Sequence, residues 1–101
     1  MIPFPFTDLS QAKRRPALAL ASLPGSDLIL AQITSQQVAD NYAVPVLPLD
    51  FEVGSLNRLS NVRPNRLFTA DQAIVLYSVG RLKREKVMEV AGKVVEILIG
   101  T

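Results

Sequence analysis

Residues 17–35 read ALALASLPGSDLILAQITS, and this stretch decides the class of fold. It holds two short apolar runs, at 17–22 and 28–35, which flank the turn-forming sequence PGSD. Alanine and leucine favour a helix by propensity, but Pro16 and Pro24 leave too short a segment between them for a stable helix. The stretch therefore predicts a β-hairpin of two antiparallel strands joined by a longer loop.

The residues before this hairpin predict little regular structure. Pro3 and Pro5 restrict the opening segment to an edge-like or irregular strand, because proline cannot donate a hydrogen bond to a neighbouring strand. The stretch 7–15 has no apolar periodicity and leads into the basic sequence KRRP at 13–16. We therefore expect a mobile loop that feeds the first strand of the hairpin.

Three stretches after the hairpin predict further strands. Residues 44–49 are apolar but are interrupted by two prolines, which predicts a weak strand at a sheet edge, and a turn follows at 54–55. Residues 60–69 and 73–79 are rich in β-branched, aromatic and other apolar side chains that suit a strand. Together with the hairpin, these stretches predict a sheet of about five short strands.

The last stretch, 83–98, predicts a helix. Its apolar residues recur at spacings of three and four, which is typical of a helix that packs one face on a core, and we expect this face to be core rather than a cofactor site. The residues of this face are Val87, Val90, Ala91, Val94, Val95 and Leu98. The chain therefore predicts a mainly β fold, a small antiparallel β-barrel with a C-terminal α-helix, in a single domain over residues 1–101.

The composition excludes several large classes of protein. The 101 residues include no cysteine and no histidine, which excludes disulfides, thiolate zinc sites and hydrolases with a histidine base. No stretch approaches the roughly 18 apolar residues of a membrane span, and no secretory signal is evident, so we expect no membrane partner and a cytoplasmic location. The nine carboxylates are scattered along the chain, so we expect no metal site and no cofactor.

Positive charge is concentrated in one part of the chain. Residues 58–84 carry six lysines and arginines against a single aspartate. Seven of the eleven basic residues of the chain are arginine, whose planar guanidinium grips phosphate groups. This distribution makes nucleic acid a candidate partner, and the alternative interpretation is a solvated basic surface without a ligand.

Five short motifs follow one another along the chain. They are PFPFTD at 3–8, KRRPALAL at 13–20, ITSQ at 33–36, SNVRPNRLFT at 60–69 and VGRL at 79–82. In this order and spacing, the chain resembles the PemK/MazF family of toxin endoribonucleases from type II toxin-antitoxin systems. The resemblance implies an SH3-like β-barrel that forms a homodimer, binds an acidic antitoxin and cuts single-stranded RNA without a metal.

The resemblance also implies which residues form the site. Arg15 matches the arginine of the family's RP motif, and Thr34 matches the threonine of its T-[ST]-Q motif, so both are expected to be catalytic. Arg63 matches a basic position in a later strand, although the acidic residue two positions on in the family is Asn65 here. The residues expected to bind RNA are Arg14, Ser35, Gln36, Arg63, Asn65 and Arg66.

Two further departures from the family concern the N-terminal part of the chain. Family members usually open with a Gly-Asp-apolar strand that this sequence lacks, so we expect a truncated first strand. Some members also use a histidine or glutamate in the loop before the RP motif. Here that loop holds Ser10, Gln11 and Ala12, with Asp8 farther away, which leaves the general base open.

The chemistry of RNA cleavage is compatible with these residues. RNA can be cut by its own 2′-hydroxyl when a protein aligns it, removes its proton and neutralises the charge that grows on the phosphate. Arg15 suits the last task and Thr34 adds a hydroxyl donor, whereas an arginine is a poor base at neutral pH. Two alternatives remain: a toxin-fold protein that binds an antitoxin or nucleic acid without cutting, and a toxin that acts on a protein target such as gyrase.

Overall fold

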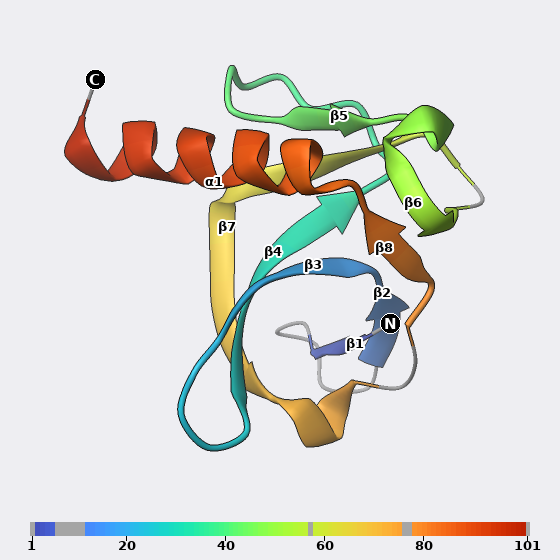
Figure 1. Ribbon diagram of the computed structural model, residues 1–101, viewed down its shortest axis with the longest axis vertical. Helices are drawn as coiled ribbons and strands as arrows, with labels where there is room; N and C mark the ends of the chain where they lie inside the picture. Colours follow the sequence, from blue (N-terminus) through green and yellow to red (C-terminus); the bar gives the residue numbers. More distant parts are fainter. Residues whose placement is uncertain (1, 6–11, 57, 76–77, 101) are drawn as a thin grey trace.

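A curled antiparallel sheet of four strands, in the order β3-β4-β7-β5, forms the centre of the protein. The computed structural model in Figure 1 describes residues 2–5, 12–56, 58–75 and 78–100. The four strands are β3 (Ala17–Ser22), β4 (Asp27–Thr34), β5 (Val44–Val46) and β7 (Ser60–Asp71). The fold is therefore mainly β, with a half-barrel sheet and one C-terminal helix among the described residues, as the sequence predicts.

Two small ribbons and a helix complete the fold. One antiparallel ribbon pairs β1 with β2, and the other pairs β6 with β8. The chain forms short 3-10 turns at Pro48–Asp50 and Gln72–Ile74. The remaining elements are β1 (Ile2–Pro5), β2 (Ala12–Arg15), β6 (Phe51–Gly54), β8 (Gly80–Leu82) and α1 (Arg84–Ile99).

Most of the strands predicted from the sequence are confirmed. The hairpin at 17–35 is β3 and β4, and the strand at 60–69 is β7, which continues to Asp71. The edge strand predicted at 44–49 is β5, which lies at the edge of the sheet and is shorter than expected. It is shorter because Pro48 begins a 3-10 turn, for which its fixed φ angle is suited.

Two predictions, for residues 7–15 and for residues 73–79, are wrong. The loop expected at 7–15 is wrong at its end, where Ala12–Arg15 pairs with β1 as a strand that local sequence preference did not indicate. Residues 6–11 of that expectation lie outside the described residues. The strand expected at 73–79 is also wrong where the chain is described, since Gln72–Ile74 forms a 3-10 turn and the next described strand begins at Gly80.

Hydrogen bonds explain why the chain turns after β7. The carboxylate of Asp71 accepts the N–H of Ala73 at 2.8 Å and so caps the 3-10 turn. The N–H of Gln72 donates to the carbonyl of Ser26 at 2.8 Å, and the hydroxyl of Ser26 donates to Asp71 at 2.8 Å. These bonds fasten the end of β7 to the β3–β4 turn, whereas a continuing strand would carry the chain away from it.

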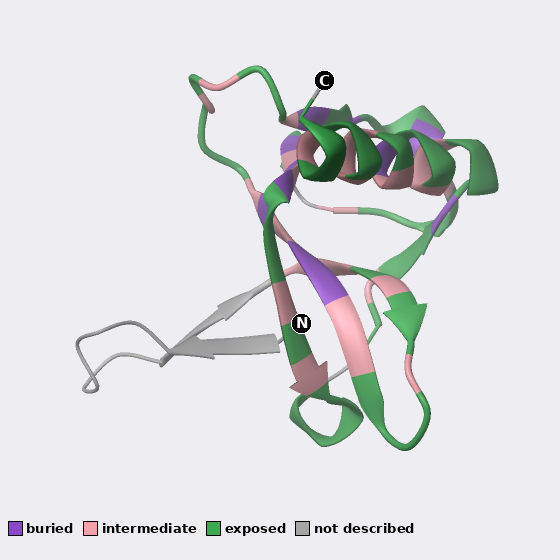
Figure 2. Cartoon of the chain, turned by 90° about the vertical axis from the view of Figure 1, so that its left-hand side faces the viewer, coloured by how far each residue is buried: buried purple, intermediate pink, exposed green. Residues whose placement is uncertain are grey.

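The hydrophobic core lies between the four-stranded sheet and α1. The buried residues of this cluster are Ala31, Ile33, Val44, Val46, Val62, Leu82 and Val90. Figure 2 shows the buried positions where the helix meets the sheet. Each of the main strands contributes alternate side chains to this layer, which is the pattern of a sheet with one face on a core.

The helix predicted at 83–98 is confirmed as α1, but its apolar face is only partly core. Val90 is fully buried, whereas Val95 is 54% exposed and Leu98 is 75% exposed. The difference arises because the last turns of α1 extend past β7 and leave the sheet behind (Figure 1). Among the described residues, no helix has the length and apolar character needed to cross a membrane.

A buried ion pair fastens α1 to the turn between β5 and β6. The Lys86 ammonium lies 3.6 Å from the Asp50 carboxylate and donates to the Pro45 carbonyl at 3.3 Å. Burial by itself lowers the pKa of Lys86, but its hydrogen bond and charge interaction with Glu89, followed by those with Asp50, outweigh burial and raise the pKa above its usual value. Lys86 therefore stays charged at neutral pH, and the start of α1 is fixed over β5.

Candidate functional site

One face of the central sheet is polar, and we call it the outer face. Gln32 and Thr34 of β4 alternate with buried residues of the core, as do Asn61 and Arg63 of β7. The register pairs Gln32 with Arg63 and Thr34 with Asn61, and directly opposed residues point to the same side of a sheet. The outer face is therefore defined by these four half-buried side chains, on the side away from the buried core.

The backbone of Arg15 reaches the same row of the sheet. Ala17 pairs with Gln32, and the N–H of Ile33 donates to the carbonyl of Pro16 at 3.2 Å. When this antiparallel register is continued by one residue, the Arg15 backbone lies opposite Thr34. The two residues expected to be catalytic come from separate strands, Arg15 from β2 and Thr34 from β4, and the register brings their backbones together. Arg14 is the residue before Arg15 in β2.

A local hydrogen bond orients the hydroxyl of Thr34. Its oxygen accepts the N–H of Gln36 at 3.1 Å, a turn in which the side chain of a threonine holds the backbone two residues on. This bond uses the hydroxyl as an acceptor, so its proton is available to donate to a ligand. Ser35 and Gln36 are both exposed at the end of β4, where a ligand on the outer face can reach them.

A bulge in β7 displays two more of the predicted residues. The register changes from Ala31 opposite Leu67 to Gln32 opposite Arg63, so residues 64–66 have no partner on β4. Such extra residues bend a strand and change the direction of its side chains. Asn65 and Arg66 are exposed there, and Arg66 makes no hydrogen bond or ion pair within the described part of the chain.

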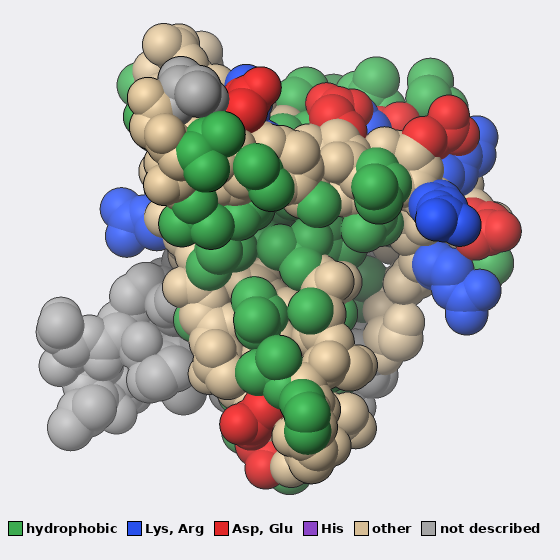
Figure 3. Space-filling view, turned by 60° about the vertical axis from the view of Figure 1, so that its left-hand side comes forward, with side chains coloured by type: hydrophobic (Ala, Val, Ile, Leu, Met, Phe, Trp, Pro, Cys, Tyr) green, Lys and Arg blue, Asp and Glu red, His purple; other side chains and the backbone are tan. Residues whose placement is uncertain are grey.

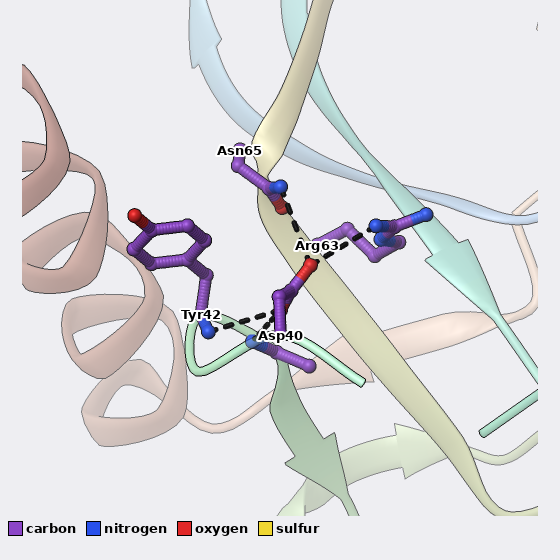
Figure 4. Close-up of polar contacts among 5 residues, drawn as sticks. Asp40, Tyr42, Arg63 and Asn65 are labelled. Atoms are coloured by element: carbon purple, nitrogen blue, oxygen red, sulfur yellow. Dashed lines mark hydrogen bonds and ion pairs between the residues drawn. The ribbon is translucent and has the colours of Figure 1, made fainter. Parts of the chain in front are cut away.

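The carboxylate of Asp40 is the centre of a polar cluster that the sequence analysis did not single out (Figure 4). One oxygen accepts the N–H groups of Tyr42 at 3.0 Å and Ala43 at 3.2 Å. The other accepts Arg63 at 3.1 Å and the amide of Asn65 at 3.4 Å. Asp40 therefore joins the loop after β4 to β7, and Arg63 is paired within the chain rather than free.

The cluster keeps Asp40 ionised. The hydrogen bond from the Tyr42 N–H lowers the pKa of Asp40 most, and partial burial raises it. The hydrogen bonds from Arg63 and Ala43, and the positive charge of Arg63, lower the pKa further. The net pKa lies below the usual value of 3.8. Because the pKa is lowered in the folded state, the stabilisation is present above the usual pKa and is lost as the pH falls through the folded-state pKa.

We expect replacement of Arg63 by glutamine to raise the pKa of Asp40 only part of the way to its usual value. The charge and the guanidinium hydrogen bond disappear, but the N–H groups of Tyr42 and Ala43 remain. A carboxyl-carbon NMR titration measures this shift. Asp71 is the internal control, because its lowered pKa depends on Ala73 and Ser26 and should not move. An unchanged Asp40 pKa in the variant would show that Arg63 does not pair with it in solution.

The core side of the sheet holds a cavity of a different character. Its volume is about 330 Å³, and its walls are mainly apolar. The larger apolar side chains that line it include Leu18, Leu30, Phe51, Leu82 and Val87. Apolar walls of this kind offer few hydrogen-bond donors to a phosphate group. Elsewhere too, the described residues include no cluster of three or more carboxylates that could hold a metal ion.

The structure thus brings some of the predicted site residues together and separates others. Arg15 and Thr34 share a row by backbone position, and Arg63 and Asn65 share the carboxylate of Asp40. Arg66 lies on the bulge next to Asn65 and pairs with no described residue. The roles of all these residues stay predictions. Sequence reasoning missed Asp40, because its two side-chain partners, Arg63 and Asn65, lie on a strand more than twenty residues away.

Comparison with solved structures finds the same fold in bacterial toxins. Mycobacterium tuberculosis toxin MazF-mt6 matches with a TM-score of 0.69 and 23% identity, over 90% of this chain and 90% of that one. A Mtb toxin matches with a TM-score of 0.66 and 22% identity, over 81% of this chain and 90% of that one. An endoribonuclease from a mycobacterial species matches with a TM-score of 0.65 and 13% identity, over 85% and 80%.

Sequence comparison places the chain in a family. No curated protein matches it significantly. The family model for PemK-like, MazF-like toxins of type II toxin-antitoxin systems matches residues 1–98, which is nearly the whole chain. Membership of a type II system implies an antitoxin partner. With the half-barrel sheet and the C-terminal helix shared with the solved toxins, the chain belongs to the PemK-like, MazF-like toxin family.

Proposed function

We propose that this toxin is a sequence-specific endoribonuclease that cuts single-stranded RNA without a metal. The observation that carries the proposal is the backbone of Arg15 opposite Thr34 in one row of the sheet, because both residue types can donate hydrogen bonds to a phosphoryl group. One of the structurally similar proteins is itself described as an endoribonuclease. An RNA-cutting toxin would act in the cytoplasm, where messenger RNA is found.

The proposed reaction uses the 2′-hydroxyl of the RNA as the nucleophile. Its oxygen forms a bond to the adjacent phosphorus while the bond from phosphorus to the 5′-oxygen breaks, which leaves a 2′,3′-cyclic phosphate and a 5′-hydroxyl. Arg15 stabilises the charge on the phosphoryl oxygens, and Thr34 donates its hydroxyl proton to one of them. The 2′-hydroxyl loses its proton to a base, and the 5′-oxygen gains one. Asp40 is a weak candidate for that base, because its pKa is lowered.

We expect the purified chain to cut a long single-stranded RNA in the presence of EDTA. In the proposed reaction, donors such as Arg15 and Thr34 carry the chemistry, and the described residues include no cluster of carboxylates that could hold a metal. Mass spectrometry of the products should find 2′,3′-cyclic phosphate and 5′-hydroxyl ends. Cleavage that EDTA abolishes and magnesium restores would contradict the metal-independent reaction.

One observation favours a second candidate function. Arg63 and Asn65 are both occupied by Asp40, and no base has been identified, so the same surface could bind nucleic acid or an antitoxin without cutting. Binding of single-stranded RNA without any product at long incubation would support this alternative. In either case, an acidic antitoxin segment would compete with RNA by placing carboxylates where phosphates bind.

We also propose that the toxin is a homodimer. The end of α1 leaves Val95, Leu98 and Ile99 exposed, and hydrophobic side chains gather on the side of the molecule where α1 ends (Figure 3). In a two-fold symmetric contact, the patch of each protomer would be buried against the same patch of its partner.

We expect light scattering at micromolar concentration to give twice the chain mass of 11.0 kDa. Leu98→Glu should give the monomer, because it puts a charge into the buried contact. The matched control is Val53→Glu, since Val53 is also an exposed apolar residue but lies on β6. A wild-type monomer would contradict the proposal.

A further inference from the structure

The carboxylate of Asp40 has no capacity left for a ligand. An ionised carboxylate offers about four lone-pair sites, and four donors already approach it. Tyr42 and Ala43 donate backbone N–H groups to one oxygen, and Arg63 and Asn65 donate side-chain groups to the other. Asp40 therefore has no acceptor site free for a bound molecule, and its contacts hold two side chains of β7 in place.

The charge of Arg63 is largely cancelled where it stands. Its guanidinium lies 3.1 Å from the Asp40 oxygen in an ion pair. A phosphate brought to the same guanidinium would approach that carboxylate, and two like charges at such distances repel each other. Arg66 lies three residues farther along β7, is exposed and pairs with no described residue, so it is the better phosphate contact of the two.

The pair nevertheless keeps directional hydrogen-bonding groups. A guanidinium has five N–H donors, and Asp40 uses Nη2 of Arg63. Nε of Arg63 is buried without a hydrogen-bond partner, so the contact with Asp40 through Nη2 is what orients the guanidinium. Asn65 donates its amide to Asp40 and is otherwise exposed, so its carbonyl oxygen remains as an acceptor. Donors and an acceptor held side by side match the edge of a nucleobase better than they match a phosphate.

We propose that Asp40 is a positioning residue that sets Arg63 and Asn65 to read the edge of an RNA base, while Arg66 provides the phosphate contact. The proposal rests on the proposed function and adds to it the residues that select the sequence. Holding the two side chains before RNA arrives reduces the entropy lost on binding, which is how a preorganised site gains specificity.

The test compares the cleavage preference of four proteins on a random-sequence RNA pool, read by sequencing the cut ends. Asp40→Asn keeps an acceptor oxygen for Tyr42 and Ala43 but removes the charge that holds Arg63. Arg63→Gln removes the proposed reader. Asp71→Asn is the matched control, because Asp71 also accepts a backbone N–H two residues on but lies at the far end of β7.

We expect Asp40→Asn and Arg63→Gln to relax the base preference at the same single nucleotide, by about 10-fold or more. Asp71→Asn should leave the preference unchanged. An unchanged preference in Asp40→Asn, or an equal loss of cleavage on all sequences, overturns the proposal. If the wild type cuts RNA without base preference, the base-reading proposal is overturned but RNA cleavage is not. If the wild type neither binds nor cuts RNA, both the base-reading proposal and the proposed function are overturned.

Salt dependence gives a second readout that a merely structural role would not move. The probe is a 2′-O-methyl oligonucleotide with the sequence of the wild-type cleavage site, which binds but has no free 2′-hydroxyl. Arg66→Gln should flatten the slope of log affinity against log salt by about 0.7, the value for one phosphate on a single strand. Arg63→Gln should leave the slope unchanged, and Asp40→Asn should steepen it by up to about 0.7 because Arg63 is released. A slope that Arg63→Gln flattens as much as Arg66→Gln would overturn the assignment of Arg63 to a base.

Discussion

Replacement of Arg15 by alanine is expected to lower the rate of RNA cleavage about 100-fold or more, which is the usual loss when one stabiliser of transition-state charge is removed. The reason is that the reaction adds charge to the phosphoryl oxygens and the chain has no metal ligands gathered among its described residues to neutralise it. The continued register places the Arg15 backbone opposite Thr34, and we propose that both residues act on one phosphoryl group. Single-turnover cleavage of a long RNA measures the loss.

Two further variants show whether the effect belongs to the site. Arg84→Ala removes an exposed arginine at the start of α1 and should keep the wild-type rate. Thr34→Val keeps the shape of the side chain and removes one donor, so its loss should be smaller than that of Arg15→Ala. Wild-type cleavage by Arg15→Ala would remove Arg15 from the site, and a larger loss for Thr34→Val would exchange the two roles.

Replacement of Gly54 by alanine is expected to cost about 3 kcal/mol or more of folding free energy, because two separate penalties add. Gly54 has a φ of 77°, a left-handed conformation that alanine adopts only with strain. An added Cβ would also lie 2.6 Å from the Cα of Gly80 and against the carbonyl oxygen of Val79, so β6 and β8 would have to move apart. For a domain of this size, the melting temperature should fall by more than about 12 °C.

Gly25 separates the two penalties. It has a φ of 88°, but nothing lies within 4 Å of an added Cβ, so Gly25→Ala carries the conformational strain alone. We expect it to cost about 1 kcal/mol, a fall of about 4–8 °C. Thermal unfolding followed by circular dichroism compares the two variants. Equal melting temperatures for them would mean that the close approach of β6 and β8 is not maintained in solution.

The elements that the sequence predicted correctly are those whose structure is set by neighbouring residues. The hairpin at 17–35 followed from two prolines and a turn sequence, and the helix at 83–98 followed from apolar spacing. The strand at 60–69 followed from side-chain type. In each case the signal lies in side-chain type, apolar spacing or turn residues within a few positions along the chain, so periodicity and turn chemistry are sufficient to reveal it.

The elements that the sequence analysis missed depend on pairing partners outside their own segment, some of them far along the chain. β2 is a strand because β1 pairs with it. The segment after β7 turns because Asp71 and Gln72 bond to Ser26 in the β3–β4 turn and Asp71 also accepts the N–H of Ala73. The ribbon of β6 and β8 requires Gly54 and Gly80 to meet, twenty-six positions apart. No local pattern records such pairings.

The same division applies to the candidate site. The sequence by itself determined the mainly β fold, the family and the residue types directed at phosphate, because these depend on composition, spacing and motif. Only the tertiary structure decided that the Arg15 backbone lies beside Thr34, that Asp40 occupies Arg63 and Asn65, and that the end of α1 is exposed. The physical reason is that charge pairing and burial depend on distances in space, and those distances are set by the register of strands that the chain brings together from separate segments.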